Sequence, residues 1–450
     1  LINDLIDAGL LVQSAFVGGE WVRNRDDRVL DVCNPADGAL IGTVPDLSVA
    51  EAPAAVDAAY DAFPTWASLL PDDRAQKLRT WYELILDERD DLALLMTLEQ
   101  GKPLVEARGE IEYAASFINW YAGEAGRVGV EGITPHLAGR DMQVVREPLG
   151  VAALITPWNF PAAMITRKAA AALAVGCTVV VKPAPETPFS ALALAALAEK
   201  AGIPAGVFNV ITGDAPTLAA MLCASPPVQA LSFTGSTRVG KLLQEQCIPT
   251  LKRVSLELGG HAPFIVFGDV DLDRAVADAV AAKFQTSGQD CLTANRIYVH
   301  ESIYDDFCTR YAQAVSTLTV GNGLTPGVDI GPLMHAGAVA KCLEHITDAT
   351  RQGARILTGG NRHDLGGLYF PPTVLADVTE DMHIATQETF GPVAALMPFA
   401  SEDEIVGRAN DTEYGLAAYV QTKDGARARR VAARLEFGMV AVNCVKMTGG

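Results

Sequence analysis

Short hydrophobic segments alternate with longer amphipathic segments through the middle of the chain. Five segments rich in β-branched and aromatic residues are separated by Ala/Leu-rich or amphipathic stretches of helical length. They are VAALI (151–155), TVVV (178–181), VFNVI (207–211), QALSF (229–233) and RVSLE (253–257). Parallel strands need crossover connections, which are usually helices. The pattern therefore predicts an α/β fold with a doubly wound parallel sheet and helices on both faces.

The regions before and after this alternation have different patterns. Residues 50 to 120 have the periodicity of long helices, including a segment that runs from 73 to Gly101, and we expect these helices to cover the sheet. After residue 260, strand-like and helical segments alternate again, which predicts a second α/β domain. Its expected strands are PFIVF, RIYVH, VAALMPF and LAAYVQT, and its expected helices lie near 272–284 and 302–318.

Composition narrows the class of protein. The chain has 450 residues, of which 49% are hydrophobic and 20% charged, enough for two or three domains with sizeable cores. The net charge of -19 is spread along the chain and opposes binding to nucleic acids and to anionic membranes. The longest apolar run, 169 to 181, is shorter than the roughly 20 residues of a membrane-spanning helix. Asp4 and Asp7 stand where a secretion signal would be positive, so we expect a cytoplasmic protein.

The cysteines and histidines point to no metal site. The eight cysteines form no C-x-x-C pair and the seven histidines no H-x-x-x-H pair. A disulfide framework is not indicated either, and reduced thiols fit a cytoplasmic protein.

Unusual turns follow four of the predicted strands, at the sheet edge where α/β proteins bind ligands. The turns are TPWNFP (156–161), KPAP (182–185), TGSTRVG (234–240) and LGG (258–260), the last directly after Glu257. The third turn opens a helix, whose free N–H groups suit a phosphate. A single cysteine, Cys291, lies in the polar and, we expect, flexible stretch TSGQDCLTANRI (286–297). Taken singly, each feature is also compatible with ordinary packing, a solvated lysine, a paired carboxylate or a structural thiol.

Seven motifs, taken together and in order, resemble the aldehyde dehydrogenase superfamily. They are TPWNFP, VKPAPETP, FTGSTRVG, LELGGHAP, GQDCLTANR, ETFGPV and NDTEYGLAAYV. The resemblance runs from FVGGEWV (16–22) to GMVAVN (438–443), and the stretch from ITRKAAAALAVG to GVFNV is most similar to the succinate-semialdehyde dehydrogenase branch.

The resemblance implies a domain organisation. We expect a Rossmann-like cofactor domain from residues 1–122 and 146–257, a catalytic domain from 258–437, and a small oligomerisation arm from 123–145 and 438–450. The family's usual C-terminal segment does not follow NCVKMTGG (443–450), so we expect the arm to be truncated there. Assembly into a homodimer or homotetramer is implied as well.

The resemblance also implies a mechanism for oxidising an aldehyde to a carboxylic acid. The thiolate of Cys291 would attack the carbonyl carbon and form a thiohemiacetal, which becomes a thioester after hydride transfer to NADP or NAD. The side-chain amide of Asn159 and the backbone N–H of Cys291 would hold the oxyanion. Glu257 would be the base for the water that hydrolyses the thioester.

The cofactor residues are likewise carried over by motif. They are Thr156, Pro157, Trp158, Lys182, Pro185, Phe233, Gly235, Ser236, Val239, Leu258, Glu388 and Phe390. Ser236 would meet the pyrophosphate, and Glu388 with Phe390 would hold the nicotinamide ribose and ring. Many NAD-using relatives have a glutamate where Pro185 stands. Because no carboxylate at 185 would repel a 2′-phosphate, we expect NADP to be accepted, beside NAD.

The substrate residues fit the closest branch only in part. That branch grips the far carboxylate of its substrate with two arginines; Arg167 fits the first, whereas Gln285 stands at the second position and carries no charge. We expect a small semialdehyde such as succinate semialdehyde, with another small aliphatic or aromatic aldehyde as the alternative. Thr293 replaces the second cysteine of some relatives, so no local disulfide switch is expected.

Two other classes of function remain open at this level. A coenzyme-A-acylating relative would pass the thioester to a thiol and typically lacks the glutamate, so Glu257 favours hydrolysis. A non-catalytic protein on the same fold need not keep Cys291, Asn159 and Glu257 together, yet all three are present.

Overall fold

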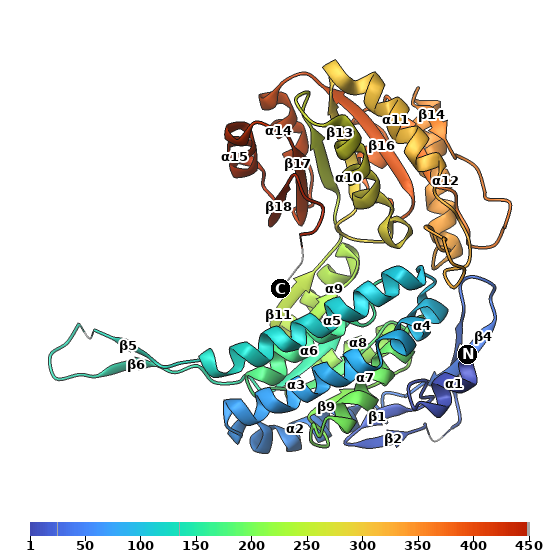
Figure 1. Ribbon diagram of the computed structural model, residues 1–450. Helices are drawn as coiled ribbons and strands as arrows, with labels where there is room; N and C mark the ends of the chain where they lie inside the picture. The colour runs from blue at the N-terminus through green and yellow to red at the C-terminus, as the bar shows by residue number, and fades with distance from the viewer. Residues whose placement is uncertain (25, 135, 448–450) are drawn as a thin grey trace.

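The computed structural model describes residues 1–24, 26–134 and 136–447, which form two α/β lobes and a projecting arm (Figure 1). The lower lobe is built on a seven-stranded sheet in the order β11-β10-β7-β8-β9-β1-β2. In that order the strands are Arg253–Glu257, Val228–Thr234, Val151–Ile155, Thr178–Lys182, Phe208–Val210, Ala15–Val17 and Glu20–Val22. The five strands from β11 to β9 are parallel and confirm the predicted sheet. The antiparallel strands β1 and β2 extend one edge of this sheet.

Helices surround the first sheet on both faces (Figure 1). The crossover helices are α6 (Ala163–Ala174), α7 (Pro188–Lys200), α8 (Ala215–Ala224) and α9 (Thr237–Cys247). The preceding helices are α1 (Ile2–Asp7), α2 (Pro53–Ser68), α3 (Pro71–Asp87), α4 (Arg89–Gln100) and α5 (Leu104–Glu124). The helical segment expected to run to Gly101 is two helices, because Glu88 leaves the helical conformation (φ -95°, ψ 16°) between α3 and α4. A small two-stranded sheet, β3 (Val29–Cys33) and β4 (Leu40–Pro45), lies beside this lobe.

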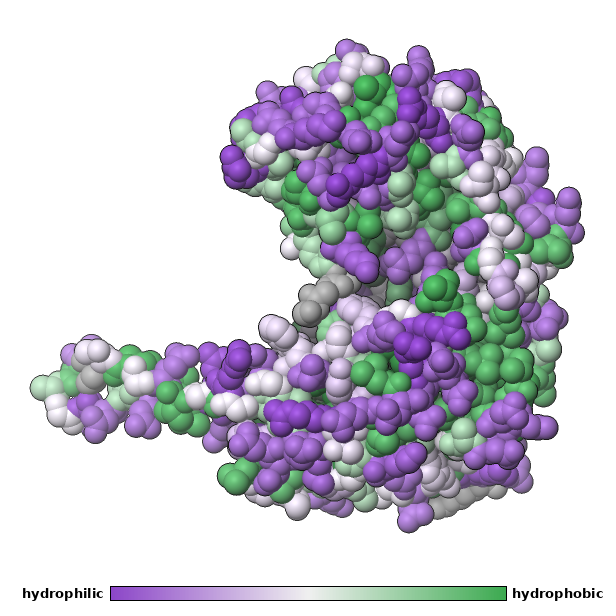
Figure 2. Space-filling model, viewed as in Figure 1, coloured by the Kyte–Doolittle hydropathy of each residue, from purple (hydrophilic) through white to green (hydrophobic). Residues whose placement is uncertain are grey.

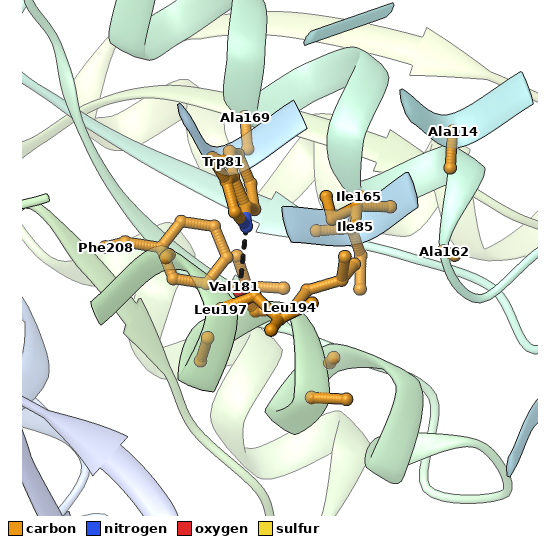
Figure 3. Packing of buried hydrophobic residues seen from close by; sticks show 14 of the residues in the cluster. Trp81, Ile85, Ala114, Ala162, Ile165, Ala169, Val181, Leu194, Leu197 and Phe208 are labelled. Atoms are coloured by element: carbon orange, nitrogen blue, oxygen red, sulfur yellow. Dashed lines mark hydrogen bonds between the residues drawn. The ribbon is translucent and has the colours of Figure 1, made fainter. Parts of the chain in front are cut away.

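Two buried tryptophans attach the covering helices to the crossover helices of the sheet, and Figure 3 shows one of them, Trp81. Trp81 of α3 is fully buried, donates its indole N–H to the carbonyl of Leu194 (3.1 Å) and packs edge-on against Phe208 (5.4 Å between ring centroids). Trp66 of α2 donates to the carbonyl of Leu173 at 3.1 Å. Removing such a ring typically costs about 3–5 kcal/mol. Since Leu173 lies in α6, this packing also fixes the helix that follows the TPWNFP turn.

The upper lobe contains the second predicted α/β unit. Its sheet has the order β14-β15-β16-β13-β12-β17-β18, with β14 antiparallel and the others parallel. The strands are Arg355–Thr358, Thr373–Ala376, Val393–Phe399, Ala294–His300, Ala262–Val266, Ala417–Gln421 and Met439–Val442. The helices are α10 (Leu272–Phe284), α11 (Tyr304–Ser316), α12 (Ala336–Arg351), α13 (His383–Thr386), α14 (Glu402–Asn410) and α15 (Gly425–Arg434).

The arm is a hairpin of β5 (Glu131–Ile133) and β6 (Met142–Val144), and all six residues are exposed. It projects from the lower lobe, and the surface above it is hollowed between the two lobes (Figures 1 and 2). The C-terminal strand differs from expectation, because residues 439–442 form β18 within the upper sheet instead of joining the arm. The backbone of β18 pairs with β17 along its whole length, and Met439 and Ala441 pack into the lobe's core.

Candidate functional site

The structure brings the first turn of the lower sheet against the cysteine loop of the upper lobe. Asn159 follows β7 and is 6% exposed, and its side-chain amide donates to the carbonyl of Gln289 at 2.9 Å. Gln289 lies two residues before Cys291 in the chain. An amide nitrogen carries two donors, so one N–H of Asn159 remains for a substrate oxygen. Within the described part of the chain, the backbone N–H of Cys291 makes no hydrogen bond.

The loop before Cys291 is anchored instead of flexible, which differs from the expectation from its polar sequence. Thr286 and Ser287 are buried and adopt left-handed conformations (φ 50° and 58°), which non-glycine residues keep only when neighbours hold them. Here Glu106 of α5 accepts a hydrogen bond from the Thr286 N–H (2.9 Å), and the Ser287 hydroxyl donates to the Gly331 carbonyl (3.0 Å). The nucleophile candidate therefore sits on a rigid support.

The thiol of Cys291 is in an environment that disfavours its ionised form. Burial raises its pKa well above the usual range, and the negative charges of Asp290, Glu388 and Glu257 act in the same direction. Cys291 is therefore a thiol at neutral pH and needs a base before it can attack a carbonyl. Glu257, at the end of β11, is the half-buried carboxylate predicted for base chemistry, and the structure places it close enough to act on the thiol's charge.

The turn after Glu257 explains how the two lobes meet. Gly260 approaches Cys291 so closely that a Cβ at this position would stand 1.9 Å from the Cys291 carbonyl oxygen. The N–H of Gly260 donates to Oε1 of Glu388 at 2.9 Å. This turn thus contacts the segments that carry Cys291 and Glu388.

Lys168 of α6 lies in the same region and was not singled out from the sequence. Its ammonium group donates to the Ser232 hydroxyl at 2.9 Å. Burial lowers its pKa to about 8, against the opposing effect of the Glu257 charge. The available signal was a lysine inside an otherwise Ala-rich helix, a position where burial requires a polar partner.

The predicted cofactor residues gather at the carboxyl ends of the lower sheet. Thr156, Pro157 and Trp158 follow β7; Lys182 and Pro185 lie at and after the end of β8; Phe233, Gly235, Ser236 and Val239 span the end of β10 and the start of α9; Leu258 follows β11.

Two features of this edge fit a nicotinamide cofactor. The hydroxyls of Thr156 and Thr234 are buried without a hydrogen-bond partner among the described residues, which leaves donors available to a ligand. Ser236 is the N-cap of α9 and accepts from the Val239 N–H at 3.4 Å, so the helix start faces the turn as a phosphate site would require.

Burial lowers the pKa of Lys182 to about 8, while the charges of Glu186 and Asp214 raise it.

The ETFGPV motif reaches this edge from the upper lobe. Burial raises the pKa of Glu388 to about 7, and its backbone carbonyl accepts a hydrogen bond from the Lys341 ammonium group. Phe390 has a left-handed backbone (φ 55°), and its ring packs edge-on against Trp158 at 5.6 Å. The structure therefore brings together predicted cofactor residues from both lobes.

Pro185 lines a recess of about 750 Å³ with Glu186 and His335. Oε1 of Glu186 lies 3.3 Å from Nε2 of His335. Position 185 carries no carboxylate, but the next residue, Glu186, does. That carboxylate already has a partner, His335 of the upper lobe. No local sequence pattern joins Glu186 and His335, so this pairing was not predictable from the sequence.

The two predicted substrate residues lie in different environments. The guanidinium group of Arg167 lies over the ring of Phe117 at 5.1 Å and forms no hydrogen bond or ion pair with another described residue. Gln285 is exposed at the C-cap of α10. No hydrogen bond joins the two side chains among the described residues. Arg167 is therefore a half-buried cation without a counter-ion in the described part of the chain.

The described residues contain no group of three or more His, Cys, Asp or Glu side chains that could hold a metal ion. No helix in the described ranges is long and apolar enough to cross a membrane.

Comparison with known proteins identifies the family. The model of the aldehyde dehydrogenase family matches residues 21–449. Succinate-semialdehyde dehydrogenase [NADP(+)] GabD of Escherichia coli is 53% identical over 98% of this chain and 91% of its own length. Glutarate-semialdehyde dehydrogenase of Pseudomonas aeruginosa is 51% identical over the same shares. The crystal structure of succinate-semialdehyde dehydrogenase from Burkholderia pseudomallei matches with a TM-score of 0.97 and 51% identity, over 98% of this chain and 92% of that one. These findings confirm the resemblance, the fold and NAD(P)-dependent aldehyde oxidation as the type of reaction, and the chain belongs to the aldehyde dehydrogenase family.

Proposed function

We propose that the protein oxidises a small aldehyde bearing a carboxylate, such as succinate semialdehyde, to the corresponding acid with NADP or NAD. The observation that carries the mechanism is the placement of the Asn159 amide 2.9 Å from the carbonyl of Gln289, on the loop of Cys291. Relatives at 53% and 51% identity are named for succinate semialdehyde and glutarate semialdehyde, and both compounds combine an aldehyde with a carboxylate.

Glu257 begins the reaction by taking the Cys291 proton, directly or through one water, because the raised pKa of the thiol prevents spontaneous ionisation. The sulfur then bonds to the aldehyde carbon, and the carbonyl electron pair moves to the oxygen. The free N–H of Asn159 and the backbone N–H of Cys291 stabilise that oxyanion, where one donor is typically worth about 3 kcal/mol. Bound nicotinamide supplies the hydride acceptor. Collapse of the oxyanion leaves a thioester on Cys291.

Hydrolysis completes the proposed cycle. Glu257 first releases the Cys291 proton to bulk water and then, as a carboxylate again, accepts a proton from the water that attacks the thioester carbon; the carbon–sulfur bond breaks, and the thiolate of Cys291 leaves. Arg167 binds the far carboxylate of the substrate, since its guanidinium group lacks a protein counter-ion in the described structure. Gln285 offers a neutral amide at the second position, so one charged side chain, and not two, would bind the substrate's carboxylate. We call this pair of residues the substrate clamp.

The first experiment measures reduced-nicotinamide formation with succinate semialdehyde, using NADP and NAD in parallel. Glu257→Gln should slow the burst of reduced cofactor and nearly abolish steady-state turnover, because Glu257 is the proposed base both for the thiol of Cys291 and for the hydrolytic water. Cys291→Ala should give neither burst nor turnover. Cys291-dependent turnover of neutral aldehydes, without turnover of any semialdehyde, would keep the mechanism and discard the substrate. Formation of acyl-coenzyme A in preference to free acid would identify the acylating alternative.

The arm is part of the proposal as an assembly element. Its hairpin projects from the lobe and exposes apolar side chains, among them Val130, Ile133, Met142, Val144 and Val145. A second copy of the chain would cover these side chains in a homodimer or homotetramer. Light scattering after size exclusion should give a dimer or tetramer mass, and Val144→Arg should lower it; a monomeric wild type would reject the assembly. The cytoplasmic location also stays a prediction.

A further inference from the structure

A buried lysine lies beneath the oxyanion site, where none of the proposed chemical steps uses it. The side chain of Lys102 is 1% exposed and donates to the backbone carbonyl of Asn159 at 2.8 Å. It also pairs with Oε2 of Glu110 at 2.5 Å and lies over the ring of Phe160, 4.2 Å from its centre. Burying an ammonium group is costly unless every donor finds a partner. These contacts therefore fix the head group in one place.

Glu110 connects the same pair to the helix after the turn. Its second oxygen, Oε1, accepts from the N–H groups of Ala162 and Ala163 at 3.1 and 3.3 Å. These N–H groups belong to the start of α6, where a carboxylate is favourable. Lys102 and Glu110 thus hold the turn of Asn159 from both sides.

The backbone of Lys102 is fixed by the other lobe. A Cβ on Gly323 would stand 2.5 Å from the Lys102 carbonyl oxygen, and one on Gly331 would overlap the carbonyl oxygen of Gly101. The two glycines therefore let the chain of the upper lobe pass directly against residues 101 and 102. The carbonyl of Gly331 also accepts the hydroxyl of Ser287, in the loop that leads to Cys291.

We infer that Lys102 is a positioning residue that couples the Asn159 amide of the lower lobe to the Cys291 loop of the upper lobe. The inference rests on the proposed role of Asn159 in holding the oxyanion. Among the described residues, the Lys102 side chain contacts Asn159, Glu110 and Phe160, so it would act on the reaction through Asn159. The backbone of Lys102 packs against Gly331 and its side chain binds the carbonyl of Asn159. A single residue therefore sets the distance between the Asn159 amide and the Cys291 loop, the two halves of the oxyanion hole. Geometry of this kind matters because a misplacement of about 1 Å can cost on the order of 100-fold in rate.

The test is a double-mutant cycle between positions 102 and 159. Lys102→Met removes the charge and both donated bonds at similar length. We expect the single-turnover rate of hydride transfer to fall roughly 10- to 100-fold, with the apparent KM for NADP changed less than about threefold. In an Asn159→Ala background the same substitution should change the rate less than about twofold, because the group it positions is gone. Glu110→Gln keeps an oxygen for Ala162 and Ala163 and should show a smaller loss with the same dependence on Asn159.

Controls separate positioning from stability. Lys252→Met removes another buried lysine of the lower lobe, whose ammonium group donates to the Ser225 carbonyl at 2.5 Å, and should leave the hydride-transfer rate unchanged. Equal losses from Lys102→Met with and without Asn159, or no loss in the wild type, would overturn the inference. Should Lys102→Met not fold, the cycle with Glu110→Gln decides in the same way. If Asn159→Ala alone reacts like the wild type, the oxyanion assignment itself fails, which is a different outcome.

Discussion

Adding one methyl group at Gly260 should displace Cys291, the proposed nucleophile. In the present structure an alanine Cβ at 260 would lie 1.9 Å from the Cys291 carbonyl oxygen, whereas ordinary contact begins at 3.4 Å. The carbonyl would have to move by about 1.5 Å, or the turn after β11 would have to retreat by as much. Retreat is opposed by the bond from the Gly260 N–H to Glu388 at 2.9 Å. Both responses change the distance between Cys291 and Glu257.

The expected result of Gly260→Ala is a loss of kcat on the order of 100-fold or more, since misplacement by about 1 Å already costs that much. Overpacking should also lower the free energy of unfolding by about 1–3 kcal/mol. Stopped-flow measurement of the burst of reduced cofactor reports the first effect, and thermal unfolding reports the second.

Neighbouring glycines provide matched controls. An alanine Cβ at Gly259 would stand 2.9 Å from Oε2 of Glu388, the end of a flexible side chain, so Gly259→Ala should raise the KM for cofactor more than it lowers kcat. Gly407 lies in α14 with nothing within 4 Å of an added Cβ, and Gly407→Ala should leave the burst rate unchanged. A folded Gly260→Ala protein with a wild-type burst rate would refute the reasoning.

Four further predictions concern substrate, cofactor and thiol. Arg167→Met should raise the KM for succinate semialdehyde about 10- to 100-fold, as expected for a charged hydrogen bond of about 1.5–3 kcal/mol, and leave a neutral aldehyde such as propanal unaffected; equal effects on both would reject the clamp. Pro185→Glu should weaken binding of 2′,5′-ADP about tenfold relative to 5′-AMP, measured by calorimetry, and an unchanged ratio would place the 2′-phosphate elsewhere. Alkylation of Cys291 by iodoacetamide should be slow at pH 7 and rise steadily to pH 9 and beyond, because burial raises the thiol pKa; a plateau below pH 8 would contradict that direction. Peroxide inactivation should not be reversed by dithiol through a disulfide between Cys291 and its neighbours, since Thr293 replaces the second thiol, and mass spectrometry of peptides would detect any such bond.

The parallel strands were predictable because burial on both faces makes them continuous apolar runs. All five residues of β7 and of β8 are buried, and the sequence shows both as unbroken segments. The three-residue strands β1 and β2 were not predicted, because so short a hairpin presents too few positions for a pattern. The break at Glu88 was also invisible, since the polar and apolar positions of α3 and α4 join into one plausible helix.

The site shows a similar division between local motifs and distant contacts. Motifs located Cys291, Glu257 and Asn159, because each of them is local in sequence. They could not show that the cysteine loop is buried and anchored, because its support comes from Glu106, 180 residues before Thr286. Contacts at such separations depend on how the two lobes face each other, which no local pattern encodes.

The turn after β11 shows why backbone space decides this site. In the sequence, Leu258-Gly259-Gly260 marks the end of the strand that carries Glu257, and Leu258 is a predicted cofactor residue. In the structure the missing side chain of Gly260 admits the carbonyl of Cys291, and its N–H holds Glu388. One turn therefore sets the positions of the proposed base, the nucleophile and the carboxylate assigned to the cofactor. Because the turn does this through its backbone, the distance between Cys291 and Glu257 does not depend on a contact between their side chains.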